Sequence, residues 1–369
     1  MKRLSKPLGF LVLGLTFLVL VGQRLEACTG LTLKAKDGAV VFGRTMEWGT
    51  FDLRSRVVII PRGFDLQSPT PDGKKGLAWK TKYGAVGIDA VEKNYLVDGM
   101  NEKGLSVNLF YHEGFAEYPK YDPAKAAKSL DVLAVCPFLL TTCATTDEAR
   151  KALADVTVVG SVVKEIGSVP PVHLMITDSS GKAFVLEFTK GVTTIHDTKL
   201  GVITNGPNYN WHVENLLNYT NLDTPLPKRK VEDLKGLKFG GGNRLFGLPG
   251  DLSSPSRFLR VASYSGTARE TDDGKETMYE IFRILDNFNL SVGASAEGSG
   301  ESNQKGMRSS TIWTTAYDTK NLVMQYHTMH NRRVRQLDLK KLDFDAKEIV
   351  RLPLDREKSQ DIEDVTPKK

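Results

Sequence analysis

The stretch CTGLTLKAKDGAVVFGRTMEW, residues 28–48, alternates between apolar and polar side chains on either side of the turn sequence KDG, residues 36–38. Alternation around such a turn predicts a β-hairpin. The pairing would bring Arg44 back alongside residues 28–32 and place a cation beside Cys28. The thiolate is the reactive form of cysteine, and a nearby cation stabilises it. The stretch therefore predicts a strand pair that carries a candidate nucleophile.

The residues before Cys28 follow the three-part pattern of a secretory signal peptide. A basic start (residues 2–6) precedes an uncharged, largely apolar run (residues 8–22), and the small residue Ala27 stands at the expected cleavage point. The apolar run is shorter than the roughly 18 residues that span a membrane. We therefore expect removal of residues 1–27 as a signal peptide, no stable membrane insertion afterwards, and a periplasmic or secreted protein.

Cleavage at this point would give Cys28 a free α-amine beside its thiol. An α-amine has an unperturbed pKa of about 8. It could act as the base for the thiol, directly or through water, as in N-terminal threonine hydrolases. Two other interpretations stay open from these residues alone. LEAC (residues 25–28) partly resembles a lipid-attachment site, although Glu26 fits it poorly, and Cys28 could also be a structural cysteine next to the cut.

The composition is that of an ordinary globular protein. The chain has 369 residues, of which 40% are hydrophobic and 25% are charged. Its net charge of +6 shrinks when residues 1–27 are removed, because that segment holds four basic residues and one acidic residue. A small charge excess without a basic stripe argues against a nucleic-acid partner.

Cysteine and histidine usage predicts neither a disulfide framework nor a metal site. Three cysteines are too few for such a framework. Cys136 and Cys143 are separated by about 10 Å along a continuous helix, so we expect buried small apolar residues rather than a disulfide. The six histidines are scattered without the spacing of metal ligands.

The remaining pattern predicts alternating blocks of strands and helices. Strands are predicted within residues 55–63, 94–112, 173–197, 201–209, 309–329 and 332–339. Helices are predicted within residues 125–154, 211–219, 254–265 and 277–288. This order favours an α+β fold with layered sheets. We expect one domain over residues 28–354, followed by a charged tail over residues 355–369.

Several segments together resemble a known family. CTGLTLKAKDGAVVFGRTMEW resembles the start of the choloylglycine hydrolase family, which includes bile salt hydrolases and penicillin V acylases. DGMNEKGLSVNLFYH, GVITNGPNYNWHVENL, FGLPGDLSSPSRFLRVA and IFRILDNFNLSVG resemble segments that occur in the same order in that family. The resemblance implies an N-terminal nucleophile hydrolase, a four-layer αββα sandwich with two antiparallel sheets. It also implies no cofactor or metal, and it suggests a homotetramer or homodimer.

The same resemblance implies hydrolysis of a linear, non-peptide amide through a thioester on Cys28. Arg44 falls on the arginine beside the nucleophile, Asn205 on the oxyanion-hole asparagine and Arg257 on the second active-site arginine. Glu47 stands where the family usually has aspartate. We expect its carboxylate to hold the Cys28 amine or to orient an arginine.

Tyr111 marks a departure that bears on the substrate. Typical bile salt hydrolases have asparagine at this position, whereas this chain resembles penicillin V acylase-like members. The backbone N–H could still serve as an oxyanion donor, while the ring would favour an aromatic or acyl group over a steroid. Met46, Trp48 and Phe51 are expected to line the apolar side of the pocket, with plain core packing as the alternative for each.

The substrate class implied is a small-molecule amide. Penicillin V-like amides are favoured, and bile acid conjugates and N-acyl homoserine lactones are alternatives. A non-catalytic envelope lipoprotein, lipidated on Cys28, is the alternative from another class. We expect the width of the pocket to depend on the loops at residues 60–75 and 155–171.

Overall fold

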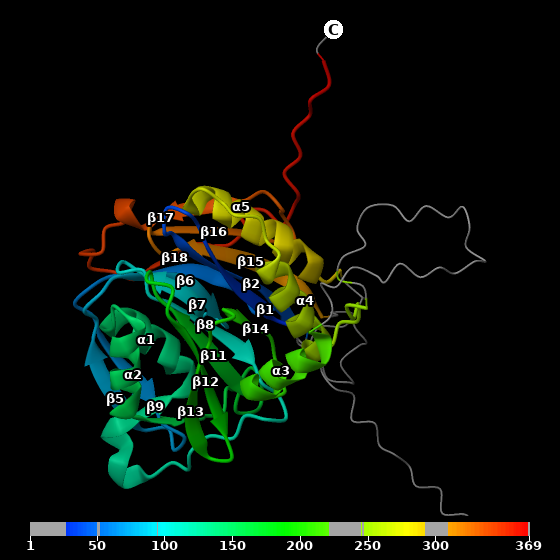
Figure 1. Cartoon of the computed structure of the whole chain (residues 1–369). Coiled ribbons are helices and arrows are strands. Elements are labelled where there is room, and N and C mark those ends of the chain that lie inside the picture. Colours follow the sequence, from blue (N-terminus) through cyan, green and yellow to red (C-terminus); the bar gives the residue numbers. More distant parts are fainter. Residues whose placement is uncertain are drawn as a thin grey trace, which may run out of the picture.

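Two antiparallel sheets form the centre of the protein (Figure 1). The computed structural model describes residues 27–49, 52–93, 95–220, 245, 247–291 and 309–367. The smaller of the two sheets has, in spatial order, β14 (Val202–Ile203), β1 (Thr29–Lys34), β2 (Val40–Trp48), β15 (Ser310–Asp318), β16 (Val323–Thr328) and β17 (Arg335–Asp338). The signal peptide predicted for residues 1–27 lies outside the described residues except for Ala27.

The larger sheet has eight strands. In spatial order they are β13 (Val192–Asp197), β12 (Ala183–Thr189), β11 (Val172–Thr177), β8 (Ser106–Tyr111), β7 (Tyr95–Asn101), β6 (Ala85–Ala90), β3 (Arg56–Ile60) and β18 (Val350–Pro353). Two small pairs lie beside it: β4 (Asp65–Pro69) with β5 (Lys75–Lys80), and β9 (Ser129–Asp131) with β10 (Thr157–Val159).

Helices cover the outer faces of both sheets. On the six-stranded sheet, α4 (Ser254–Gly266) packs on β1, and α5 (Gly274–Leu285) packs on β1, β2 and β15. On the other side of the molecule, α1 (Val135–Thr142) packs on β7 and β8, and α2 (Thr146–Ala154) follows it (Figure 1). The order of layers is therefore helix, sheet, sheet, helix, as the resemblance implied. The shorter helices are α3 (Tyr209–Asn215), η1 (Pro123–Lys128), η2 (Val132–Ala134), η3 (Leu216–Tyr219), η5 (Asp286–Phe288) and η6 (Leu339–Lys341).

The predicted hairpin is the β1–β2 pair. Its register sets Gly30 opposite Arg44, which confirms the expected return of the second strand beside the first. Gly38 has a φ of +86° in the turn, a conformation that glycine adopts readily. Gly43 lets α5 approach closely, because a Cβ atom there would lie 2.3 Å from Cγ2 of Ile281.

The helix predicted over residues 125–154 is wrong as a single element. The strand β9 interrupts it and pairs with β10 in parallel. A second break precedes α2, where the Thr145 side chain accepts a hydrogen bond from the Glu148 N–H, and the Glu148 carboxylate accepts one from the Ala144 N–H. This reciprocal capping starts a new helix rather than continuing the old one. Cys136 and Cys143 are buried and free, as predicted.

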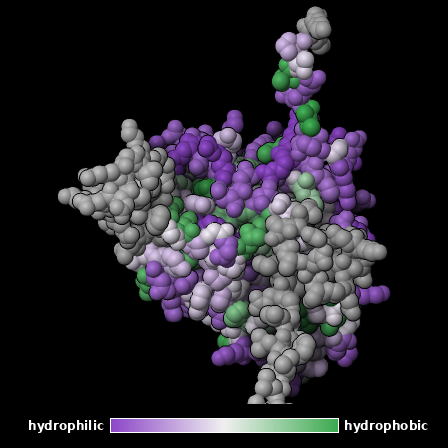
Figure 2. Space-filling model, turned by 90° about the vertical axis from the view of Figure 1, so that its right-hand side faces the viewer, coloured by the Kyte–Doolittle hydropathy of each residue, from purple (hydrophilic) through white to green (hydrophobic). Residues whose placement is uncertain are grey.

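The apolar side chains are gathered mainly between the layers. On the face shown in Figure 2, the described surface is mostly hydrophilic, with hydrophobic residues in small groups. Among the described residues, no helix is long and apolar enough to cross a membrane. From Asp355 to Pro367, within the predicted tail, the chain has no regular secondary structure. Lys358 of this tail forms an ion pair with Asp52.

Candidate active site

Strand β2 distributes the candidate residues over two faces, because successive side chains of a strand point to opposite sides. Arg44 and Trp48 point between the sheets: the Arg44 guanidinium lies 4.3 Å from the centre of the Phe110 ring, and Trp48 contacts Tyr111 edge to face at 5.6 Å. Glu47 points toward the helical layer. This alternation places a cation and apolar groups on one side of the strand and a carboxylate on the other.

The Cys28 thiol lies between the sheets, next to Arg44. Nη2 of Arg44 is 3.1 Å from Sγ of Cys28, and Sδ of Met46 is 3.8 Å from the same sulfur. Cys28 and Arg44 are both buried. The predicted placement of a cation beside this thiol is confirmed as a contact.

Helix α4 brings Arg257 to the other side of Cys28. Ser253 caps this helix by accepting from the Ser256 N–H, and Pro255 stands in the first turn. Arg257 donates to the carbonyl oxygen of Cys28 and to Oγ1 of Thr29, the latter at 2.9 Å. Burial lowers the pKa of this guanidinium to about 10, so it is a cation at neutral pH.

Arg257 also fixes Asn205, which follows β14. Nη2 of Arg257 donates to Oδ1 of Asn205 at 2.7 Å, and Nδ2 of Asn205 donates to the carbonyl oxygen of Tyr111 at 2.8 Å. The Asn205 N–H donates to Oγ of Ser254 at 2.9 Å. Because Oδ1 faces an obligate donor, the amide hydrogens must point toward Tyr111 and the space beside it.

Glu47 is fixed by two threonines. Its carboxylate accepts from Oγ1 of Thr45 at 3.1 Å and from Oγ1 of Thr311 at 2.5 Å. In the part of the chain that the structure describes, neither Arg44 nor Arg257 donates a hydrogen bond to the Glu47 carboxylate. Burial raises the pKa of Glu47 to about 7, against the hydrogen bonds of the threonines and the charges of the arginines.

A second buried carboxylate, missed in the sequence, belongs to Asp98 on β7. It accepts from Oγ1 of Thr315 at 2.7 Å. Burial raises its pKa to about 7, and the charge of Arg44 opposes this shift. An aspartate inside the apolar strand YLVDGMN is itself a signal, since a buried carboxylate needs partners.

A cavity opens beside the Cys28 thiol. Its empty space is about 570 Å³ when the part open to solvent is counted, and about 50 Å³ of it can take the centre of a water-sized molecule. Its lining is apolar apart from a few groups and consists of Cys28, Met46, Glu47, Trp48, Leu53, Ala90, Val91, Tyr95, Val97, Leu109, Tyr111, Leu133, Val163, Ile166, Pro170 and Val172. Met46 and Trp48 thus lie where predicted, whereas Phe51 lies outside the described residues. The loop at 155–171 contributes to the wall as expected. The loop at 60–75 does not, and the segments around Leu53 and Val91 take that place.

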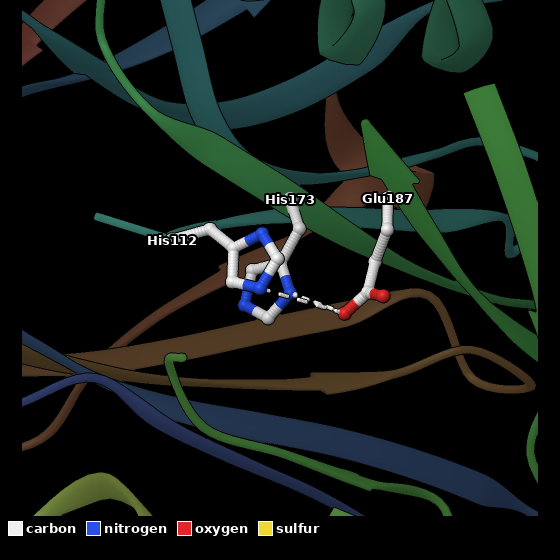
Figure 3. Close-up of side chains that lie close together, drawn as sticks. All are labelled: His112, His173 and Glu187. Atoms are coloured by element: carbon white, nitrogen blue, oxygen red, sulfur yellow. Dashed lines mark hydrogen bonds and ion pairs between the residues drawn. The ribbon is translucent and has the colours of Figure 1, made fainter. Parts of the chain in front are cut away.

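Four of the six histidines gather behind Asn205, which their scattered positions in the sequence did not predict. His112, His173 and Glu187 lie with their polar atoms within 4.8 Å of one another (Figure 3). His196 and His212 complete the group through hydrogen bonds or ion pairs. Glu187 in the apolar strand AFVLEFT and His173 in VHLMIT were the available signals, because buried polar groups require partners.

An αββα sandwich with a candidate nucleophile just before a central strand defines the N-terminal nucleophile hydrolase fold. Comparison with known proteins places the chain within this class. Residues 28–352 match the linear amide C-N hydrolases of the choloylglycine hydrolase family, and the chain belongs to that family. It is a hydrolase that acts on linear amide C–N bonds.

The relatives include bile salt hydrolases and a penicillin V acylase. The chain is 31% identical to a bile salt hydrolase/transferase of Clostridium perfringens over 87% of this chain and 95% of that protein. It is 28% identical to a penicillin V acylase of Pectobacterium atrosepticum over 82% of this chain and 78% of that protein. A structure of a conjugated bile acid hydrolase variant from Clostridium perfringens superposes with a TM-score of 0.78 at 29% identity, covering 92% of this chain and 100% of that one.

Proposed function

We propose that this protein is an exported hydrolase that uses Cys28 as its nucleophile and cleaves a small amide with an aromatic or other apolar acyl group. The observation that carries the proposal is the 3.1 Å contact between Nη2 of Arg44 and Sγ of Cys28 at the edge of the apolar cavity. A thiol beside a buried cation and an open cavity can reach the carbonyl carbon of a bound amide.

Processing before Cys28 supplies the base. It frees the α-amine, and it removes Ala27, which is fully buried in the unprocessed chain. The amine takes the proton of the thiol while sulfur attacks the carbonyl carbon, and it gives that proton to the leaving amine as the C–N bond breaks. Water then cleaves the thioester, which releases the carboxylic acid and restores the thiol.

The oxyanion would be stabilised beside Tyr111. The Asn205 amide nitrogen carries two hydrogens and gives one to the Tyr111 carbonyl oxygen, so its second is available for the substrate oxygen. The Tyr111 backbone N–H is the second donor that we assign. Arg257 acts on this group through Asn205, because its hydrogen bond to Oδ1 turns the amide hydrogens toward the substrate.

The cavity supports an apolar acyl group of modest width. Trp48 and Tyr111 meet edge to face along one wall, and branched aliphatic side chains form most of the rest. Aromatic rings favour such edge contacts with another ring. We therefore place penicillin V-like amides before conjugated bile acids, and long-chain acyl homoserine lactones after both.

The decisive experiment compares turnover of penicillin V, glycocholate and a long-chain acyl homoserine lactone by the processed protein and by Cys28→Ala. We expect penicillin V to have the highest kcat/KM and Cys28→Ala to be inactive. Intact mass of the protein after expression with its leader should match a chain that begins at Cys28. A diacylglycerol adduct on Cys28 would instead indicate the lipoprotein. A large preference for glycocholate would contradict the inference that the Tyr111 ring favours an aromatic or acyl group over a steroid. Light scattering tests the homotetramer or homodimer.

A further inference from the structure

His173 on β11 lies between two hydrogen-bond acceptors. Its Nε2 is 3.0 Å from the carbonyl oxygen of Thr204, and its Nδ1 is 3.3 Å from Oε1 of Glu187. A carbonyl oxygen never carries a proton to donate. Burial opposes the ionisation of Glu187, but hydrogen bonds from His173 and His196 outweigh it and hold the pKa of Glu187 well below its usual range. Both ring nitrogens of His173 must therefore be donors, which makes the ring an imidazolium.

The neighbouring His112 does not share this charge. Its ring stacks on that of His173 with centres 4.3 Å apart and planes 2° apart (Figure 3). Burial lowers the pKa of His112 to about 3, and the charge of His173 lowers it further. One cation and one anion, His173 and Glu187, thus form the charged pair of this cluster, and His112 covers it as a neutral ring.

A metal ion bound by His112, His173 and Glu187 is the alternative explanation for a ring nitrogen that faces a carboxylate. The ring planes argue against it, because a metal ligated by imidazole lies close to the plane of the ring, along the nitrogen lone pair. Two planes 2° apart with ring centres separated by 4.3 Å do not converge on one such point. In addition, Oε1 of Glu187 already accepts from the Tyr209 N–H at 2.7 Å.

The charged pair holds the backbone that carries Asn205. His173 donates to the carbonyl oxygen of Thr204, the residue that precedes Asn205. His212 binds the carbonyl oxygen of Asn205 itself through Nε2 at 2.9 Å. Glu187 accepts from the N–H of Tyr209, where α3 begins, and so fixes the far end of the same loop. The segment from Thr204 to Tyr209 is therefore anchored on both sides by this one cluster.

We propose that the His173 imidazolium and Glu187 are positioning residues that fix the Thr204–Asn205 backbone, so that the Asn205 amide faces the substrate oxygen. The inference rests on the proposed function of Asn205. Neither side chain reaches the cavity beside Cys28, and both act through the backbone of the loop. A misplacement of about 1 Å at a reacting group can reduce the rate about a hundredfold, so the anchoring matters for turnover.

The test compares Glu187→Gln with His327→Gln, a control at a buried histidine on β16 in the other sheet. For Glu187→Gln we expect kcat on the best amide substrate to fall about tenfold to a hundredfold with little change in KM. His327→Gln should keep the wild-type kcat. Circular dichroism and thermal melting confirm that each variant is folded.

A second readout does not depend on turnover. In ¹⁵N-histidine spectra at pH 7, the wild-type protein should show one buried ring with both nitrogens protonated, and Glu187→Gln should lack it. A wild-type kcat in Glu187→Gln would overturn the positioning role. One equivalent of zinc in the wild-type protein that is lost in Glu187→Gln would overturn the imidazolium. If no tested amide is hydrolysed by the wild-type protein, the proposed function fails, and the spectra still decide the charge of His173.

Discussion

Thr311→Val removes the shorter of the two hydrogen bonds to Glu47 while keeping the shape of the side chain. Oγ1 of Thr311 donates to Oε1 of Glu47 at 2.5 Å and accepts from the Leu290 N–H at 2.8 Å. Thr311→Ser keeps the hydroxyl and is the matched control. The pair of variants therefore isolates the hydroxyl. Its third partner is the carbonyl oxygen of Phe288 at 3.4 Å, and only Glu47 among the three titrates.

The expected size of the effect follows from the charge on the acceptor. A hydrogen bond to a charged group contributes about 1.5–3 kcal/mol, which corresponds to about one to two pKa units. Burial already raises the pKa of Glu47 to about 7, so its contribution to stability is present at acidic pH and is lost as the pH rises through that value. In Thr311→Val the pKa rises further, and this loss continues to higher pH.

Urea unfolding at pH 5 and pH 9 measures the difference. At pH 5, where Glu47 is protonated in both variants, Thr311→Val should be less stable than Thr311→Ser mainly because the Leu290 N–H has lost its acceptor. At pH 9 the gap in the free energy of unfolding should be wider by about 1.5–3 kcal/mol. If ionised Glu47 holds the α-amine, the acid limb of kcat/KM should also move up by about one to two pH units. Stability curves that run parallel from pH 5 to pH 9 would refute this reasoning.

Four further predictions test other parts of the site. Arg257→Lys keeps the charge but cannot reach all the acceptors of the guanidinium, so initial rates should show kcat/KM reduced by about 10²–10³. Asp98→Asn should flatten the fall in urea midpoint between about pH 4 and pH 7, because a carboxyl whose pKa is raised to about 7 loses stability over that range. Gly43→Ala should lower stability by about 1–3 kcal/mol in thermal melts, since its Cβ would lie 2.3 Å from Ile281. Tyr111→Asn should shift the ratio of kcat/KM for penicillin V over glycocholate by about tenfold toward glycocholate.

Short-range features were predictable from the sequence because local rules determine them. The contact between Cys28 and Arg44 follows from a hairpin whose turn sets the register, and Gly30 opposite Arg44 is the outcome. Asn205 and Arg257 could be placed at the site only through the family resemblance. No local pattern relates α4 to the end of β14.

The histidine cluster lies beyond such reasoning for a physical reason. Its members come from β11, β12, β13, α3 and the end of β8, which only the tertiary fold brings together. The single helix predicted for residues 125–154 was wrong although the composition favours a helix. The Asp131 carboxylate accepts hydrogen bonds from the N–H groups of Leu133 and Ser161, and these bonds fix a strand in the middle of the segment. Tertiary hydrogen bonds override propensity there.

Arg44 combines two functions that a single substitution cannot separate. The pairs between β7 and β8 end at Asp98–Asn108, and beyond that point the Arg44 guanidinium donates to the carbonyl oxygens of Val97 and Leu109, one on each strand. The side chain thus satisfies the backbone where the two strands separate and the cavity begins. Its removal would leave buried carbonyls unpaired as well as deprive Cys28 of a cation. Loss of activity in an Arg44 variant would therefore not show that Cys28 is the nucleophile. Changes at Thr311 alter the electrostatics of the site and leave the Arg44 contacts with β7 and β8 in place.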